Sequence, residues 1–317
     1  MDQYLAYYNL REDPFRLTPD PAFYYPSQEH MLALQSLQYC MEHREGFCCI
    51  TGEPGTGKTT VLRIFLGEWQ DLAEIALIMT PRLSPEEFLR AVLEDLNVPI
   101  AQAGKNGMLK AFREFLVGHA EAGRSVAIVV DEAQDLPAET LEELRLLSNL
   151  ETDKHKLLQI ILIGQPELAA MLQEEKFKQL NQRITVRASR GPLEQPSASD
   201  YIKTRLIKAG NSGAVFEEKA LLGLYLLSNG VPRMLNVIAS RALMVGFLQE
   251  SRTISAAQVA VAGADLKTNS QAGKEVDNSR RMVPVPSSQL ILNASLFVVA
   301  VVLLLIISYG IWKEFAK

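Results

Sequence analysis

The sequence predicts an α/β fold with a parallel sheet, followed by a small all-helical domain and a single C-terminal transmembrane helix. Three observations lead to this prediction. Apolar runs alternate with helical patterns in the first part of the chain, only helical patterns follow residue 193, and the run 290–312 carries no charged residue. Strands that alternate with helices are typical of a parallel sheet covered on both faces. The expected boundaries are 1–193 for the α/β domain with its N-terminal segment, 194–266 for the helical domain, 267–289 for a flexible linker, 290–312 for the transmembrane helix and 313–317 for a short tail.

Four short apolar runs are the expected strands, because continuous aliphatic runs of this length fit the buried strands of a parallel sheet. Between the second and third, SPEEFLRAVLEDL begins with Ser84, Pro85 and Glu87, a capping box with proline in the first turn. A further helix is expected in LPAETLEELRLLSNL, with Pro137 at its start. The four runs are GFCCIT, EIALIMT, SVAIVVD and KLLQIILIG, at 46–51, 74–80, 125–131 and 156–164.

The second domain contains four helical patterns, two of which end at glycines that fit helix termini, Gly210 and Gly230. The patterns are SASDYIKTRLIKAG, EEKALLGLYLLSNG, VPRMLNVIASRALMVGFLQE and SAAQVAVAGADL. The linker that follows is polar, holds two prolines and has no apolar period.

Composition places the chain among globular proteins and argues against a dominant nucleic-acid-binding surface. Its 317 residues are 48% hydrophobic and 22% charged, with a net charge of -5, whereas nucleic-acid-binding domains are usually basic. The three cysteines, Cys40, Cys48 and Cys49, have no framework spacing, so we expect reduced core thiols of a cytosolic domain and no metal site. The N-terminus lacks the pattern of a cleavable signal peptide.

The stretch GEPGTGKT, Gly52 to Thr59, matches the phosphate-binding loop G-x-x-x-x-G-K-[ST]. It follows an apolar strand and begins the helical stretch KTTVLRIFLGEW, which is the context that the motif requires. Backbone N–H groups and the helix N-terminus would hold phosphate, Lys58 would reach the β- and γ-phosphates, and Thr59 would bind Mg²⁺. ATP and Mg²⁺ are therefore the expected cofactors. The expected binding residues are Gly52, Glu53, Pro54, Gly55, Thr56, Gly57, Lys58, Thr59 and Thr60.

Asp131 and Glu132 end the apolar run VAIVVD and begin DEAQDL. Asp131 would hold the Mg²⁺ ion or its water shell, and Glu132 would orient and deprotonate the attacking water. A solvated surface pair is the alternative, but the position after a buried strand favours an ATPase site.

The run Leu290–Trp312 has 23 residues and the length of a membrane-spanning helix. At about 1.5 Å per residue it measures roughly 34 Å, against a hydrocarbon core about 30 Å thick. Tyr309 and Trp312 lie near one end, as interfacial aromatic residues do. A buried core helix is the alternative, but such a helix usually has a polar stripe. Because ATP and Mg²⁺ are cytosolic, the large N-terminal part is expected on the cytoplasmic side of the membrane.

The motifs GKTT, VVDEAQDL, LLQIILIGQPEL, LNQRI and GVPRMLN together resemble the AAA+ ATPases of the general secretion pathway protein A (ExeA) family. The opening segment YYNLREDPFRLTPDPAFYYPSQEHMLAL is also similar to that family, and the resemblance covers residues 4–266. It implies a P-loop AAA+ core with a parallel sheet and a helical lid.

The resemblance also implies three further catalytic residues. Gln165 matches the sensor-1 position, Arg183 the arginine finger that acts on a neighbouring subunit's ATP, and Arg233 the sensor-2 position of the lid. Their alternatives are a strand-end turn residue, a surface arginine paired with Glu174 or Glu175, and a helix-start arginine.

Two groups of residues are less defined by the motifs. Phe15, Tyr25 and Pro26 are candidates for the wall of an adenine pocket, with apolar packing as the alternative. Gln134 and Asp135 complete DEAQD and are not assigned a catalytic role, because helix capping explains Asp135 equally well.

The resemblance implies that the chain forms a homo-oligomeric ring, often a hexamer in this fold family, at the bacterial inner membrane with its ATPase domain on the cytoplasmic side. It would act with an inner-membrane partner protein in secretin assembly for type II secretion, in mannose-sensitive pilus biogenesis or in exopolysaccharide export. The family's secretion protein carries a periplasmic peptidoglycan-binding domain after its membrane helix. This sequence stops at Lys317, so direct peptidoglycan binding is not expected.

Two alternatives belong to other classes of protein. One is a DNA-binding AAA+ regulator resembling transposition-helper ATPases, for which Lys203, Arg205 and Lys208 could share part of a helix face. The acidic net charge and the membrane segment argue against it. The other is a nucleotide-dependent membrane scaffold with low turnover, against which Lys58, Thr59, Asp131 and Glu132 argue together.

Overall fold

The computed structural model describes residues 3–79, 81–100, 104–151, 156–212 and 214–266, and Met1–Gly263 form one compact unit. The predicted linker, transmembrane helix and tail (267–289, 290–312 and 313–317) lie outside the described residues and stay predictions. Among the residues that are described, no helix has both the length and the apolar character that a membrane span requires.

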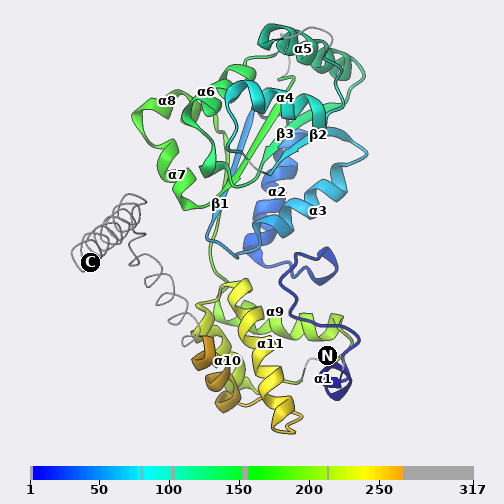
Figure 1. The fold of residues 1–317 in the computed structure, drawn as a ribbon, viewed down its shortest axis with the longest axis vertical. Helices are drawn as coiled ribbons and strands as arrows, with labels where there is room; N and C mark the ends of the chain where they lie inside the picture. Colours follow the sequence, from blue (N-terminus) through cyan, green and yellow to red (C-terminus); the bar gives the residue numbers. More distant parts are fainter. Residues whose placement is uncertain (1–2, 80, 101–103, 152–155, 213, 267–317) are drawn as a thin grey trace, which may run out of the picture. The chain divides into compact units, whose positions relative to one another are not determined.

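A five-stranded, all-parallel sheet forms the centre of the α/β part, with the strand order β2-β3-β4-β1-β5 (Figure 1). The predicted parallel sheet is confirmed, and each of the four apolar runs forms a strand. The fifth strand was not predicted, because β5 is an edge strand in which only Val186 and Arg190 are buried. The strands are β1 (Phe47–Gly52), β2 (Ala73–Ile78), β3 (Ser125–Val130), β4 (Gln159–Gly164) and β5 (Val186–Arg190).

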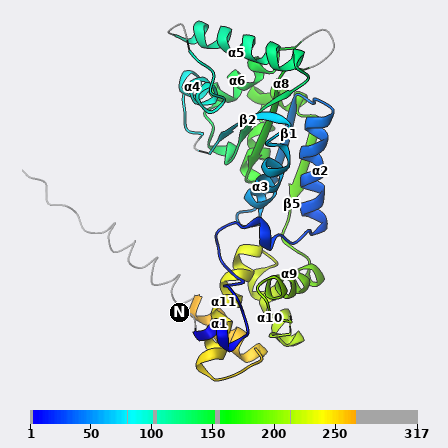
Figure 2. The same cartoon turned by 90° about the vertical axis from the view of Figure 1, so that its right-hand side faces the viewer.

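Helices cover both faces of the sheet, as Figures 1 and 2 show from two directions. Because successive strand residues point to opposite faces, the neighbours Cys48 and Cys49 lie in two separate apolar cores. Both thiols, like that of Cys40, are free and buried, as expected. On one face lie α2 (Gln28–Glu42) and α3 (Lys58–Trp69). On the other lie α4 (Pro85–Asp95), α5 (Lys105–Glu121), α6 (Ala138–Leu147) and α7 (Pro166–Leu172).

The local signals at two helix starts are present in the structure. Ser84 and Glu87 form the capping box of α4, with Ser84 N donating to the Glu87 carboxylate at 2.9 Å. Pro137 is the N-cap residue of α6. The short elements of this part are η2 (Ala133–Asp135), η3 (Glu175–Phe177) and α8 (Lys178–Arg183).

In the described residues only helices follow β5, and these helices form the lid. Its core is lined by the buried side of α11, including Leu235, Ala239 and Leu243. Gly210 and Gly230 have positive φ angles of 101° and 73°, so each ends a helix as the sequence indicates. The lid helices are α9 (Gln195–Lys208), α10 (Glu218–Ser228) and α11 (Pro232–Leu248), with a further helical stretch at 256–266.

The N-terminal segment packs on the lid before it reaches the sheet. Its first helix, α1 (Gln3–Tyr7), contacts α11, and the Tyr8 hydroxyl donates to the carbonyls of Leu243 and Ser251 at 3.2 and 3.0 Å. The Arg11 N–H donates to the Ala209 carbonyl at 2.7 Å. The segment then forms η1 (Pro21–Phe23), which contacts α9 and α3. It thereby passes close to the phosphate loop at the start of α3.

Candidate nucleotide site

The phosphate loop connects β1 to α3 and depends on two glycines. Gly55 and Gly57 have φ angles of 80° and 93°, in the left-handed region that favours glycine. The space around them is also closed. A Cβ on Gly55 would lie 2.7 Å from the Arg233 Cβ, and one on Gly57 would lie 2.9 Å from His30 Nε2. The loop is therefore fixed by neighbours from the lid and from α2 as well as by its own backbone.

Two charged groups of the predicted site, Lys58 in the loop and Asp131 after β3, are buried. The Lys58 ammonium group donates to the carbonyls of Gly52 and Glu53, at 2.6 and 3.2 Å. Burial lowers the pKa of Lys58, although the charges of Glu132 and Asp131 act in the opposite direction. Burial likewise raises the pKa of Asp131, whose carboxylate accepts from the Glu132 N–H at 3.0 Å. Because burial removes much of the hydration of both charged groups, an opposite charge brought close to either of them stabilises its ionised form.

Glu132 follows β3 in a left-handed conformation, with a φ of 51° that non-glycine residues seldom adopt. One carboxylate oxygen, Oε2, accepts from the side-chain amides of Gln134 and Gln165, at 2.8 and 3.1 Å. Partial burial pushes the pKa of Glu132 upward. The two hydrogen bonds and the charge of Lys58 outweigh this, so its pKa lies below the ordinary value. Glu132 is thus an ionised carboxylate held in one orientation.

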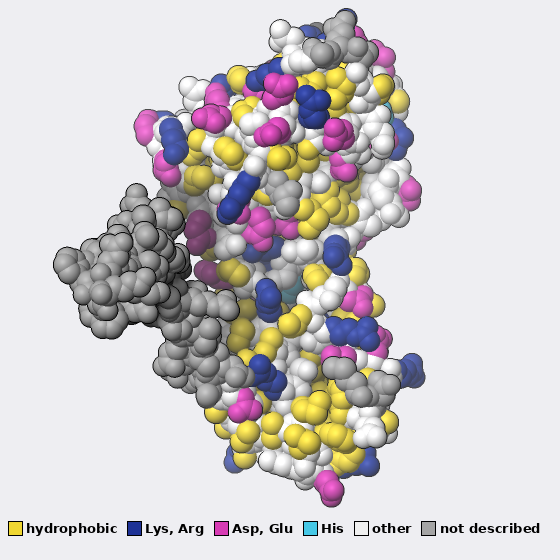
Figure 3. Space-filling model, viewed as in Figure 1, with side chains coloured by type: hydrophobic (Ala, Val, Ile, Leu, Met, Phe, Trp, Pro, Cys, Tyr) yellow, Lys and Arg dark blue, Asp and Glu magenta, His cyan; other side chains and the backbone are white. Residues whose placement is uncertain are grey.

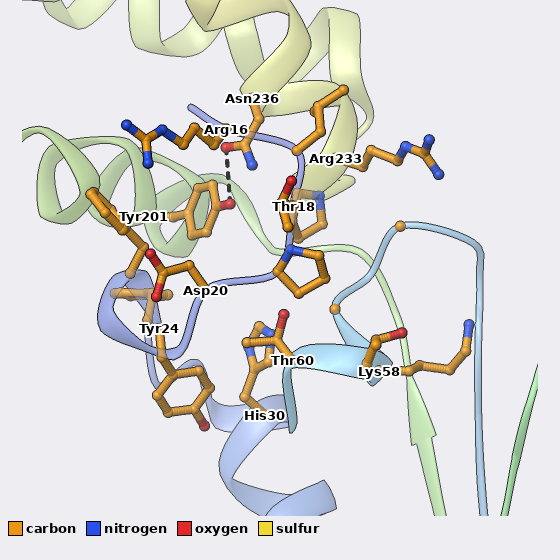
Figure 4. Close-up of a pocket in the computed structure, with 18 of the residues that line it drawn as sticks. Arg16, Thr18, Asp20, Tyr24, His30, Lys58, Thr60, Tyr201, Arg233 and Asn236 are labelled. Atoms are coloured by element: carbon orange, nitrogen blue, oxygen red, sulfur yellow. Dashed lines mark hydrogen bonds between the residues drawn. The ribbon is translucent and has the colours of Figure 1, made fainter. Parts of the chain in front are cut away.

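A cavity of about 440 Å³ brings most of the predicted site residues together (Figure 4). At one end it reaches the phosphate loop, Glu132 and Gln165, and at the other it reaches the N-terminal segment and the lid. The predicted residues that are not among its lining residues are Gly52, Glu53, Thr56, Asp131 and Arg183. The predicted residues that do line it are Pro54, Gly55, Gly57, Lys58, Thr59, Thr60, Glu132, Gln165 and Arg233.

The far end of the cavity has aromatic and amide side chains suited to a flat ring. The Tyr201 hydroxyl donates to Asn236 Oδ1 at 2.9 Å, a bond that Figure 4 draws between α9 and α11. Of the three candidates for an adenine wall, Tyr25 lines the cavity. Phe15 instead packs against Phe216, with the two ring centroids 6.2 Å apart, and Pro26 is not a lining residue.

The two predicted arginines lie in different places. Arg233 extends from α11 alongside the phosphate loop (Figure 4), and its backbone N–H donates to the Gly55 carbonyl at 3.2 Å. Arg183 ends α8 and donates to Ser148 Oγ and Asn149 Oδ1, at 2.9 and 2.6 Å. It pairs with neither Glu174 nor Glu175, which bind Lys176 and Lys178. A role for Arg183 in catalysis therefore requires the site of another subunit.

The residues present fit Mg²⁺ bound together with a nucleotide. Thr59 lines the cavity and supplies a hydroxyl, and Asp131, next in the chain to the lining residue Glu132, supplies a carboxylate. Mg²⁺ prefers such oxygen ligands, usually one or two from the protein with phosphates and water completing the set. The described part of the chain has no group of three His, Cys, Asp or Glu residues that could hold a metal.

Sequence reasoning missed several residues that the fold brings to this site. Gln134 was left without a role, yet it holds Glu132 and also accepts from the Gln165 N–H at 3.0 Å. His30, Tyr201 and Asn236 line the cavity from α2, α9 and α11. DEAQD offered a signal for Gln134, but no local pattern marks the other three.

Comparison with known proteins confirms the resemblance predicted from the motifs. Residues 41–172 match the family model described as an AAA domain. General secretion pathway protein A of Aeromonas hydrophila is 40% identical over 264 residues, which cover 83% of this chain and 48% of that protein. Residues 41–172 thus form an AAA domain, and the chain is related to general secretion pathway protein A, of which it spans about half the length.

Solved structures share the fold at low sequence identity. Drosophila ORC bound to DNA gives a TM-score of 0.60 at 14% identity, covering 83% of this chain and 65% of that one. ORC1 of Aeropyrum pernix in complex with DNA gives 0.57 at 18% identity, covering 89% and 75%. Cdc6p of Pyrobaculum aerophilum gives 0.56 at 17% identity, covering 79% and 68%. Identities this low support the P-loop AAA fold and no more.

Proposed function

We propose that this AAA+ protein, a relative of general secretion pathway protein A, hydrolyses ATP at the inner membrane of a bacterium. The energy would drive assembly or operation of an envelope export system. The observation that carries the proposal is the position of Glu132, fixed by Gln134 and Gln165 at the wall of a cavity that Lys58 and Thr59 also line.

In this proposal each group has one task. The phosphate loop and Lys58 hold the phosphates, which would draw the Lys58 ammonium group away from its two loop carbonyls. Thr59 and Asp131 would hold Mg²⁺, which would partly neutralise the negative charge of the phosphates. Glu132 is ionised and accepts the proton of the attacking water, while Gln165 keeps its carboxylate in place.

The proposal includes coupling between subunits and to a membrane partner. Arg183 would act on ATP in a neighbouring subunit of a ring. Its guanidinium binds the neutral Ser148 and Asn149 side chains and forms no ion pair with a carboxylate of the described residues. Arg233 would report the state of the nucleotide to the lid, since it joins α11 to the phosphate loop. The predicted helix 290–312 would hold the ring at the membrane and contact a second membrane protein.

A two-part experiment tests the proposal with the full chain. First, purified protein in detergent should release phosphate from ATP only when Mg²⁺ is present. Second, in cells the full chain should stay in the membrane fraction through carbonate extraction, whereas a chain ending at Gln289 should not. Replacement of 290–312 by an unrelated membrane span is the matched control. It should restore membrane retention but lose crosslinks to the partner if the contact is specific.

The outcomes separate the parts of the proposal. No phosphate release by assembled wild-type protein would leave a nucleotide-dependent scaffold as the better interpretation. A full chain that carbonate removes from membranes would contradict the anchor.

The DNA-binding alternative finds no support in the three basic residues that suggested it. Arg205 is buried and donates to the Pro14 carbonyl, Lys203 pairs with Glu218 at 3.0 Å, and Lys208 donates to the Tyr24 carbonyl at 2.7 Å. On the face of the molecule in Figure 3, Lys and Arg side chains are interspersed with Asp and Glu. DNA affinity that falls steeply with salt would nevertheless revive this alternative.

A further inference from the structure

A buried arginine lies behind the phosphate loop, outside the set of residues that line the cavity. Arg190 is the last residue of β5 and pairs with Gly52 in the parallel register, so it lies beside the start of the loop. It is only 2% exposed, and its guanidinium group donates to the Thr56 carbonyl. Its Nη1 would lie 3.5 Å from a Cβ on Gly57. Arg190 thus contacts the loop from its first glycine to its last.

The charge of Arg190 has no partner among the described residues. The guanidinium forms no ion pair there, and its Nε and Nη1 have no hydrogen-bond acceptor. Burial lowers the pKa of Arg190 to about 10, while the charge of Glu29 acts in the opposite direction, so Arg190 stays protonated at neutral pH. His30, which packs against the same loop, is a neutral neighbour because burial and Arg190 lower its pKa to about 3. An unpaired buried cation is costly unless another group compensates it.

The hydrogen bond to Thr56 has a geometric consequence for the loop. In a trans peptide the C=O and N–H bonds point in opposite directions, and the described chain has no cis peptide. Because Arg190 binds the Thr56 carbonyl, the Gly57 N–H points away from Arg190. Gly57 lines the cavity and Arg190 does not, so this N–H is directed to the side where phosphates would lie.

We propose that Arg190 is a positioning residue of the phosphate loop and that the phosphates of the bound nucleotide compensate its buried charge. The inference rests on the nucleotide site of the proposed function. The inference extends the proposed function by a preference among nucleotides, which the loop distinguishes by the number of phosphates they carry. The reason is that each negative charge of the phosphates interacts with Arg190 through a medium of low dielectric constant. A purely structural arginine would affect all nucleotides equally.

The test measures equilibrium binding of ATP, ADP and AMP to the full chain in detergent, with EDTA present so that hydrolysis does not contribute. Arg190→Met removes the charge and the hydrogen bond, Arg190→Gln removes the charge but keeps a donor, and Arg190→Lys keeps the charge. Arg187→Met is the matched control, because Arg187 is an exposed arginine of the same strand that bonds Asn181. Melting temperatures are recorded without nucleotide and at saturation.

Arg190→Met and Arg190→Gln should weaken ATP binding by about tenfold or more, in the range typical of charge-assisted contacts, and ADP binding by less. AMP binding should change little, and neither variant should melt earlier than wild type without nucleotide. Arg190→Lys should keep most of the preference for ATP over AMP, and Arg187→Met should match wild type.

Equal weakening for all three nucleotides would overturn the inference, as would unchanged ATP binding. If Arg190→Met does not fold, the comparison of Arg190→Gln with Arg190→Lys decides, because it separates charge from shape. A wild-type chain that binds none of the three nucleotides would contradict the proposed function instead.

Discussion

Because His30 is buried, we expect the free energy of unfolding to depend on pH. Its side chain is 4% exposed, its Nδ1 lies 2.6 Å from Ser27 Oγ, and its ring packs edge-on against Tyr24 at 5.5 Å. Burial, and then the charge of Arg190, lower its pKa from 6.5 to about 3. Below pH 6.5 the unfolded chain therefore binds a proton that the folded chain rejects, so the free energy of unfolding falls as the pH falls.

The size of the effect follows from the two pKa values. One pH unit corresponds to about 1.4 kcal/mol, so at pH 5 His30 should cost the folded state roughly 2 kcal/mol relative to pH 7.5. Any folded pKa that lies well below 5 gives the same value at pH 5. The loss should begin near the unfolded pKa of 6.5 and continue toward the folded pKa of about 3.

Thermal or denaturant unfolding of the full chain in detergent, at pH 7.5 and 5.0, measures the effect. His30→Asn should lose less stability than wild type over this interval, by roughly the 2 kcal/mol assigned to titration of the imidazole. His43→Asn is the control, because His43 is exposed at the end of the same helix, and it should follow wild type. An equal loss in wild type and His30→Asn would refute the reasoning.

Three further predictions concern the site. Gly55→Ala should weaken nucleotide binding about tenfold or more, because its Cβ requires a strained φ of 80° and lies 2.7 Å from the Arg233 Cβ; calorimetry measures this. Arg183→Ala should leave nucleotide binding intact but lower ATP hydrolysis by the oligomer roughly 10³-fold, as loss of an arginine finger does; phosphate release measures this. Gln134→Ala should raise the pKa of Glu132, since it removes a hydrogen bond to the carboxylate, and so move the acid limb of the pH–rate profile to higher pH.

Each of these variants has a matched control on the same chain. Gly118→Ala meets no atom within 4 Å, so it should not affect nucleotide binding. Arg187→Ala and Gln173→Ala change exposed residues and should keep wild-type turnover and pH profile. Loss of turnover by Arg187→Ala as large as that of Arg183→Ala would count against an arginine finger at residue 183.

The sheet and the phosphate loop could be predicted because their signals are local. A buried parallel strand must be apolar along its whole length, which is why GFCCIT and SVAIVVD were recognisable. The loop sequence is set by backbone angles and by contact with phosphate, and Gly55 and Gly57 indeed have the left-handed conformations that only glycine adopts easily. Strand β5 could not be predicted in this way, because few residues of this edge strand are buried and the last of them is the charged Arg190.

The rest of the site depends on contacts between distant parts of the chain. His30 meets Gly57, Tyr201 meets Asn236, and Arg190 meets Thr56 only after the lid, the N-terminal segment and β5 have packed around the loop. No periodicity or spacing records such contacts. Basic residues illustrate the converse: Arg205 looked like part of an exposed helix face, yet the fold places it between α9 and the N-terminal segment.

Comparison of Glu132→Gln with wild type tests the central claim most directly. Both proteins, as full chains in detergent, are assayed for ATP binding and for phosphate release with Mg²⁺. We predict that the variant binds ATP within about threefold of wild type and hydrolyses it roughly 10² to 10⁴ times more slowly, since only the proton acceptor is lost. Equal rates of hydrolysis would contradict the assignment of Glu132 as the base.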